Sequence, residues 1–344
     1  MTKTRHMLSV TDAGGLIATV PRLLGFQPEE SIVVLCVRSK TMGPAMRADL
    51  PPMREVAPLA DHLARQSVRH ADAVALLVFS GRRDARKALA RVLEAMLATG
   101  MAVIDAIVVD GDTAMFLPDR NGRSRDPVSV PGSQDAFVAR LDAETAFAGR
   151  SVLPNRAALE ASVRAPRASK LRRARQAMKQ AREQAYPECG DLASTEAPFH
   201  SILDSALAEF DRQRSVAPVT AATLALLAQD TTIRDLMIGR IIDDRQTDWL
   251  PALISAVVQV PGDESEDLCA ILASAAYRSG DGALAQVSVD RCLQTRPDHR
   301  LAELLQDIMS AGLAPSILDA LGADLVRQEL LDDQYWDAGG YRSM

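Results

Sequence analysis

The sequence has few of the side chains that bind metals or form disulfides. Four cysteines and five histidines are spread over 344 residues, and no two cysteines stand at CxxC spacing. Structural zinc sites and disulfide frameworks need closely spaced ligands, so the sequence predicts neither, and no metal and no cofactor is expected. The cysteines are interpreted as buried reduced thiols: Cys36, Cys189, Cys269 and Cys292.

Long apolar runs and recognisable catalytic motifs are also missing. No stretch approaches the roughly 18 uninterrupted apolar residues of a membrane span, and the first residues contain no apolar core of signal-peptide length. We therefore expect a cytoplasmic protein without a membrane partner. The chain has no GxSxG, HExxH, P-loop or GxGxxG pattern, which disfavours the hydrolase, metalloprotease and nucleotide-binding chemistries that those motifs support.

Aromatic residues make up only 4% of the chain, and charge is its more informative feature. Residues 1–189 hold 28 Lys+Arg against 20 Asp+Glu, a balance of +8. Residues 190–344 hold 11 against 25, a balance of −14. Such asymmetry can mark a surface that binds a charged partner, or it can let the two halves of one molecule attract each other.

The stretch LGFQPEESIVVLCV, residues 24–37, predicts a corner between a helix and a strand. Thr11 or Asp12 can cap a helix that ends at Gly25, and the apolar run that follows is typical of a strand buried on both faces. We interpret Glu29 and Glu30 as the polar turn between these elements. A catalytic pair of carboxylates would need separately tuned environments, which two neighbours on a loop do not have.

Strands and helices alternate after this corner. The pattern predicts strands at about 43–49, 73–79, 102–109 and 113–117, helices at about 54–70 and 83–99, and a mobile loop over 118–132. Asp110-Gly111 is a hairpin signal. Together these elements predict an α/β domain over residues 1–150 with a mixed sheet of about five strands.

From residue 133 onward the sequence shows helical periodicity only. Helices are expected over 133–148, 155–163, 167–185, 195–213, 219–228 and 231–243, followed by paired helices to about 323. The prediction is basic connecting helices at 151–190, an all-helical domain at 191–325 and a flexible tail at 326–344. The acidic loop PGDESED, residues 261–267, lacks the ligand order of a calcium loop and is interpreted as a solvated linker with a helix-start bias.

The segment RAPRASKLRRARQAMKQAR, residues 164–182, carries eight cations and no acid. On a helix, three- and four-residue spacing would align four of these cations in one basic stripe: Arg172, Arg175, Lys179 and Arg182. Such a stripe would suit a phosphate backbone, while the acidic C-terminal half is the intramolecular alternative. The segment lacks the interleaved aromatics with which single-strand binders stack bases. The residues predicted to contact nucleic acid are Lys170, Arg172, Arg173, Arg175, Lys179 and Arg182.

A second candidate site is the link between a predicted strand and the following helix, formed by Ser80, Gly81, Arg82 and Arg83. Backbone N–H groups at a helix N-terminus, together with two guanidinium groups, could hold a phosphate or a carboxylate. The alternative is an ordinary polar connection, because most loops of this kind have no ligand.

The segment AAYRSGDGALAQVSVDRCLQTRP, residues 275–297, resembles one tetratricopeptide unit. Small side chains let two antiparallel helices approach, and the terminal proline stops the second helix. Arrays of such units usually bind peptides in a concave groove. The positions that carry this resemblance are Ala275, Tyr277, Gly280, Asp281, Ala285, Leu293 and Pro297.

Four segments together resemble the actinobacterial family catalogued as domain of unknown function 4192: TVPRLLGFQPEESIVVLCV, FAGRSVLPNRAALEASV, TTIRDLMI and GDGALAQVSVDRCLQTRPDHRLAELL. The resemblance spans residues from about 8 to 323. Many members of that family have a tryptophan and paired cysteines after the second hairpin. Here FLPDRNGRSRDPVSVPG has neither, and this departure from the family pattern disfavours a metal or redox role for this chain. The family brings no agreed activity.

Taken together, these features favour a non-enzymatic interaction or scaffold protein whose helical half recruits a protein partner, with self-association left open. One alternative is a nucleic-acid-associated factor that uses the basic helix at 164–182. The other is an α/β enzyme or binding protein that takes an anionic small molecule at residues 80–83.

Overall fold

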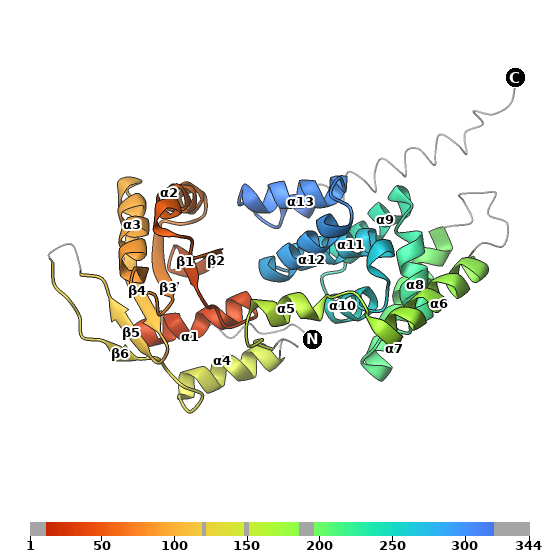
Figure 1. Cartoon of the computed structure of the whole chain (residues 1–344), viewed down its shortest axis with the longest axis horizontal. Coiled ribbons are helices and arrows are strands. Elements are labelled where there is room, and N and C mark those ends of the chain that lie inside the picture. Colours follow the sequence, from red (N-terminus) through yellow and green to blue (C-terminus); the bar gives the residue numbers. More distant parts are fainter. Residues whose placement is uncertain (1–11, 119–121, 148–150, 186–195, 320–344) are drawn as a thin grey trace, which may run out of the picture. The chain divides into compact units, whose positions relative to one another are not determined.

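The computed structural model describes residues 12–118, 122–147, 151–185 and 196–319, with the backbone alone for 185 and 196–200. The chain forms two compact units, Met1–Ala158 and Leu159–Met344, and each is described by itself (Figure 1). The predicted tail at 326–344 and the last predicted helical residues, up to about 323, lie outside the described residues.

The first unit contains a mixed sheet whose described strands follow the order β2-β1-β3-β4-β5-β6. Only β3 and β4 pair in parallel, and the other neighbours are antiparallel. The elements are α1 (Ala13–Leu24), β1 (Ser31–Arg38), β2 (Thr41–Asp49), α2 (Met53–His70), β3 (Ala73–Phe79), α3 (Ala85–Ala98), β4 (Ala102–Asp110), β5 (Thr113–Phe116), β6 (Val128–Ser129) and α4 (Ala136–Phe147).

The mixed α/β architecture is confirmed, and the sixth strand is the difference from the prediction. β6 lies inside the segment predicted to be a loop and pairs antiparallel with β5, Ala114 opposite Val128. A strand of two residues shows no alternation of apolar and polar side chains, and Pro127 and Pro131 flank it with loop signals. The sequence therefore contains no pattern by which such a short strand could be recognised.

The corner between α1 and β1 forms as the sequence predicts. The Asp12 carboxylate accepts a hydrogen bond from the Gly15 N–H at 2.7 Å and so caps α1, and Gly25 ends the helix with φ of 75°. Glu30 has φ of 42°, a left-handed backbone conformation suited to a tight turn. Its carboxylate accepts a hydrogen bond from the Ser80 hydroxyl at 2.9 Å, which ties this corner to the end of β3.

The core of the first unit lies between one face of the sheet and the helices α2 and α3. Alternate residues of the central strands, such as Ile32, Leu76 and Val108, meet the apolar faces of these helices in one buried cluster. Their neighbours on the opposite face, such as Val33 and Leu77, are equally buried. A strand buried on both faces reads as a continuous apolar run, which explains the sequence pattern of β1 and β3.

The described part of the second unit contains helices and no strand, as predicted. Its elements are α5 (Arg156–Ser162), which begins in the first unit, α6 (Ala168–Ala185), α7 (Glu196–Gln213), α8 (Pro218–Leu227), α9 (Thr231–Asp243), α10 (Leu250–Val257), the 3₁₀ turn η2 (Gly262–Glu264), α11 (Glu266–Arg278), α12 (Gly282–Thr295) and α13 (Arg300–Ser310). Among the residues that the structure describes, no helix combines the length and the apolar character needed to cross a lipid bilayer.

The helices α11 and α12 form the hairpin expected from residues 275–297. Gly280 has φ of 83° in the connecting turn, and the Asp281 carboxylate caps α12 by accepting a hydrogen bond from the Leu284 N–H at 3.0 Å. Ala285 is fully buried, and the Tyr277 hydroxyl donates a hydrogen bond to the Leu313 carbonyl. The helix pair is therefore present, while its tetratricopeptide-like character remains a prediction.

An ionic cluster around a buried carboxylate, which we call the Asp267 clamp, joins four parts of the second unit. The Asp267 carboxylate on α11 pairs with Arg234 on α9 at 3.2 Å and with Arg296 after α12 at 2.8 Å. His299 donates from Nε2 to the same carboxylate at 2.9 Å, because its Nδ1 accepts a hydrogen bond from the Ala302 N–H at the start of α13. Both ring nitrogens of His299 are therefore engaged in structure.

The pKa of the Asp267 carboxyl reflects two opposing effects. Burial raises this pKa, but the hydrogen bond from His299 and the charge of Arg296 outweigh burial and hold the pKa below its usual value. The buried carboxylate is thus charged at neutral pH, and Arg234, Arg296 and His299 stabilise its charge.

Candidate functional site

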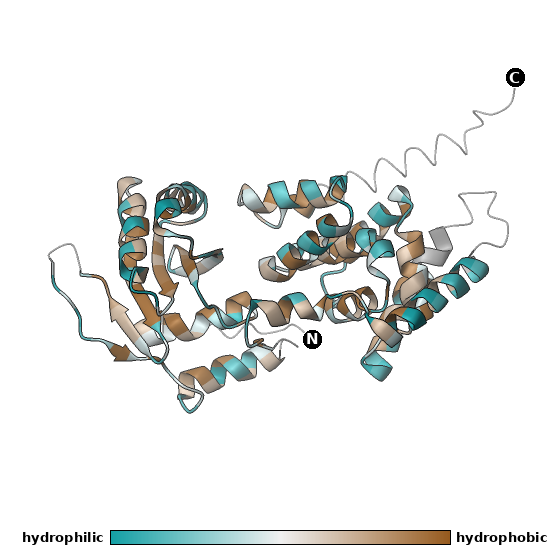
Figure 2. Cartoon of the chain, in the orientation of Figure 1, coloured by the Kyte–Doolittle hydropathy of each residue, from teal (hydrophilic) through white to brown (hydrophobic). Residues whose placement is uncertain are grey.

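The helix α6 is amphipathic, with a narrow apolar face and a broad polar one. Ala174, Ala177, Met178 and Ala181 are buried, and their spacing places them on one stripe that packs against α8. Small side chains on this stripe allow the two helices to lie close together. The remaining circumference of α6 faces away from this contact, and Figure 2 shows it as largely hydrophilic.

The predicted stripe of cations divides into two rows on the polar side of α6. At 100° per residue, Arg175 and Arg182 lie next to the apolar face and form the inner row. Arg172 and Lys179 lie farther round the helix and form the outward row. Arg175 pairs with Asp263 at 3.5 Å, and Arg182 pairs with Glu264. Among the described residues, the one ion pair of Lys179 is a long contact of 3.8 Å with Glu183 on its own helix.

Five cations at and before the start of α6 have no ion-pair partner in the part of the chain that the structure describes. All five are exposed to solvent. The first turn of α6 contains no acidic residue that would offset their charge. We call this set the basic surface: Arg164, Arg167, Lys170, Arg172 and Arg173.

The two acids that neutralise the inner row come from η2, which we call the acidic turn, residues 262–264. This turn is held by contacts of its neighbour: the Ser265 hydroxyl donates to the Gly262 carbonyl at 3.1 Å and accepts from Arg291 at 2.8 Å. Arg291 also donates to the Val163 carbonyl, just before the basic surface. One arginine of α12 therefore fixes the acidic turn beside the basic segment.

The link at Ser80–Arg83 is occupied by contacts within the first unit. Arg82 donates to both carboxylate oxygens of Asp84, at 2.9 and 2.7 Å, and to the Leu50 carbonyl at 3.0 Å. The hydrogen bond from Arg82 lowers the pKa of the Asp84 carboxyl against the opposing effect of burial. Arg83, by contrast, is exposed and forms no ion pair among the described residues.

Two further carboxylates lie against the same link. Glu30 accepts the hydrogen bond of the Ser80 hydroxyl, and an added Cβ at Gly81 would lie 2.9 Å from a carboxylate oxygen of Asp110. An anion bound here would meet these acids and would have to displace Asp84 from Arg82. The geometry matches the polar-connection interpretation better than an anion site.

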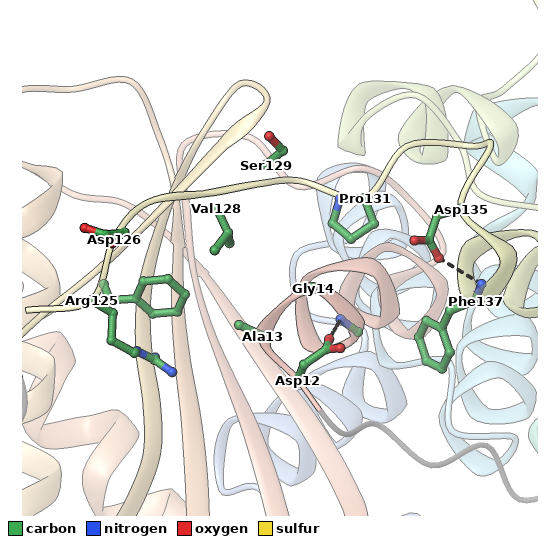
Figure 3. A pocket seen from close by; sticks show the side chains of 12 residues that line it. Asp12, Ala13, Gly14, Arg125, Asp126, Val128, Ser129, Pro131, Asp135 and Phe137 are labelled. Atoms are coloured by element: carbon green, nitrogen blue, oxygen red, sulfur yellow. Dashed lines mark hydrogen bonds between the residues drawn. The ribbon is translucent and has the colours of Figure 1, made fainter.

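A cavity of about 570 Å³ lies elsewhere in the first unit, and residues 80–83 do not line it. Figure 3 shows that Asp12 and Asp135, which line it, each accept a backbone hydrogen bond at the start of a helix. The Arg125 guanidinium lies 3.7 Å from the centre of the Phe116 ring and pairs with Asp105. These charged groups thus stabilise the walls of the cavity.

The sequence pattern correctly places four cations on one side of α6, namely Arg172, Arg175, Lys179 and Arg182, but it does not reveal the acids that pair with Arg175 and Arg182. The loop at 261–267 was interpreted as solvated, yet Asp263 and Glu264 contact α6 across more than 80 residues of sequence. It also missed Asp267 and His299. The local signal is that residues 261–267 contain several acids and no cation. This signal does not indicate which cations the acids contact.

Comparison with known proteins gives one match. A family model described as "Domain of unknown function (DUF4192)" matches residues 14–316 of the chain. Neither the curated proteins nor the solved structures contain a significant match.

Proposed function

The chain belongs to the DUF4192 family, whose description assigns no activity, and we propose that it is a non-enzymatic interaction factor. In this proposal the second unit recruits an acidic segment of a protein partner through the basic surface. The observation that carries the proposal is the group of five exposed cations that lack ion-pair partners in the described part of the chain. Such a group is electrostatically unsatisfied until an anionic partner covers it.

The acidic turn supports a protein partner over other polyanions. Its side chains provide an example within the molecule of carboxylates on a short turn that fit arginines one heptad apart on α6, at Arg175 and Arg182. Arginine recognises carboxylates through a planar set of donors, so a partner with spaced acids could bind the arginines of the basic surface in the same way.

The surroundings of this surface are part of the same proposal. We take the α11–α12 pair as a tetratricopeptide-like unit that gives the second unit a rigid frame, and we place the protein in the cytoplasm of an actinobacterium. Self-association through the acidic and basic regions of two copies would use the same chemistry. A homogeneous monomer at low ionic strength would count against that last extension.

The experiment is an affinity pull-down from the native host, with and without nuclease. We compare the wild type with a neutralised variant, Lys170→Gln/Arg172→Gln/Arg173→Gln. The control variant, Arg65→Gln/Lys87→Gln/Arg300→Gln, removes the same charge from exposed cations elsewhere. The proposal expects a protein that resists nuclease, is lost with the neutralised variant and is retained by the control. Retention by all three proteins would refute it.

A second candidate function is association with nucleic acid through the same helix, and the outward row of Arg172 and Lys179 favours it. Residues seven apart on a helix are about 10 Å apart along the axis, a spacing that lets both reach one phosphate backbone. This candidate expects nucleic acid to co-purify and retention on heparin to fall steeply with salt. Protein that is free of nucleic acid at both low and moderate salt would remove it.

A further inference from the structure

The acidic turn contacts α6 in the way proposed for the partner, because its carboxylates pair with arginines of this helix. Arg175 and Asp263 are both highly exposed, with 62% and 63% of their side chains accessible. Arg182 is half exposed, whereas only 19% of the Glu264 side chain is accessible. Exposed ion pairs are weak and screened by salt, so a partner that brings several acids could displace the turn.

The acidic turn does not depend on these ion pairs for its position. Arg291 holds Ser265, and it also donates to the carbonyls of Val163 and Val257. An added Cβ at Gly262 would lie 3.4 Å from the Ala165 side chain, which shows how closely the turn lies to the basic segment. The carboxylates of Asp263 and Glu264 can therefore be neutralised while the backbone of the turn stays in place.

We infer that the acidic turn is an autoinhibitory element that competes in cis with the acidic partner for α6. The inference rests on the proposed function and specifies its regulation. With the turn in place, Arg175 and Arg182 are neutralised, and the negative charge beside the basic surface repels an incoming acidic segment. The partner then binds only through the unpaired cations of the basic surface. It can also contact Arg175 and Arg182 once the acidic turn no longer pairs with them.

The test is a fluorescence anisotropy titration with a labelled oligoglutamate peptide at low ionic strength. The variant Asp263→Asn/Glu264→Gln keeps the shape of both side chains and removes two negative charges. We expect it to bind the peptide about three- to tenfold more tightly than the wild type. Glu264→Gln alone should account for more of the gain than Asp263→Asn, because the charge of the less exposed side chain is less screened.

A matched control separates this effect from a general change of net charge. Glu303→Gln/Asp307→Asn removes two exposed acids of α13 that have no ion-pair partner among the described residues, and it should leave the affinity within about twofold of the wild type. A second pair of substitutions, Arg175→Gln/Arg182→Gln, should abolish the gain when it is added to the variant of the turn. In the wild-type background it should change the affinity less than Lys170→Gln/Arg172→Gln does.

The outcomes distinguish the inference from the proposed function. If the wild type binds the peptide through the basic surface but Asp263→Asn/Glu264→Gln binds no more tightly, the autoinhibitory role is refuted and the function stands. If neither protein binds, the function itself fails. Tightening toward a DNA duplex without tightening toward the peptide would overturn the assignment to a protein partner. Should the variant of the turn fail to fold, the wild-type background decides. There, Arg175→Gln/Arg182→Gln should weaken peptide binding less than Lys170→Gln/Arg172→Gln does, and equal weakening would refute the autoinhibitory role.

Discussion

Each of the two units is stabilised internally by a different kind of buried contact. In the first unit the sheet interior is apolar on both faces, and residues such as Leu35, Leu76 and Leu77 are fully buried. In the second unit small residues such as Ala276 and Ala285 bring helices close together, and the Asp267 clamp lies among them. The first arrangement depends on burial of apolar area, and the second depends in addition on charge.

This difference has a consequence for where function can be placed. In the first unit, the interior is apolar, and the charged side chain of Arg82 in a loop makes hydrogen bonds to nearby groups of the same unit, Asp84 and the Leu50 carbonyl. In the second unit α11 is buried along most of its length, whereas α6 keeps a broad side exposed to solvent and places its cations there. The exposed side of α6 is therefore the part of the second unit on which the proposed function rests.

The largest expected effect is the loss of the Asp267 clamp. Asp267→Ala removes the carboxylate that Arg234, Arg296 and His299 share. It should lower the free energy of unfolding by about 3 kcal/mol, at the lower end for a buried pair, because Arg234 keeps Asp235 and Arg296 is partly exposed. Leu76→Ala in the sheet should cost a similar amount, about 2–5 kcal/mol, through a cavity alone. Urea denaturation of both variants measures this. A loss below about 1 kcal/mol for Asp267→Ala would show that the clamp is not needed.

The next effect concerns pH and separates the two kinds of contact. Because the folded-state pKa of Asp267 is lowered, its contribution is fully present above the unfolded pKa of about 3.9 and is lost as pH falls through the folded value. The stability difference between the wild type and Asp267→Asn should therefore be large at pH 6 to 7 and shrink in acid.

Thermal unfolding followed across pH 2.5 to 7 measures that difference. The cost of Leu76→Ala serves as the control, since it involves no titrating group and should vary much less over the same range. A stability difference between the wild type and Asp267→Asn that stays constant with pH would contradict the assigned pKa direction.

A smaller effect tests the link at Ser80–Arg83. Arg82→Ala removes the donor to Asp84 and to the backbone after β2, and it should lower the unfolding midpoint clearly. Arg83→Ala should change stability by no more than about 0.5 kcal/mol, as is usual for exposed positions. Neither variant should alter the response to added phosphate. Stabilisation of the wild type by phosphate that is lost in Arg83→Ala would revive the anion site.

How much of this could be predicted from sequence depends on how local each signal is. The end of α1 at Gly25 and the limits of β3 and α9 follow from periodicity and capping, and they were predicted closely. Periodicity also placed four of the cations of α6 on one side of the helix. The partners of Arg175 and Arg182, and the contact of Asp267 with His299, join residues distant in sequence, and no local pattern encodes them.

The smallest effect concerns the reactivity of the cysteine thiols, which reports how well the interior of each unit excludes solvent. Burial raises the pKa of Cys36 to about 11 and that of Cys292 to about 12, and it also raises the pKa of Cys269. These three thiols should not react with Ellman's reagent in the folded protein and should react fully in denaturant. Mass spectrometry of the labelled peptides assigns the sites. Rapid labelling of Cys36 under native conditions would show that the sheet interior opens easily.

The most direct measurement of the central claim is the affinity of the basic surface for an acidic peptide. An anisotropy titration compares the wild type, Lys170→Gln/Arg172→Gln/Arg173→Gln and the charge-matched control Arg65→Gln/Lys87→Gln/Arg300→Gln. We predict that the first variant binds the oligoglutamate peptide about tenfold more weakly than the wild type, while the control stays within about twofold of it. Equal weakening by both variants would show that net charge alone attracts the peptide and would contradict a defined binding surface on α6.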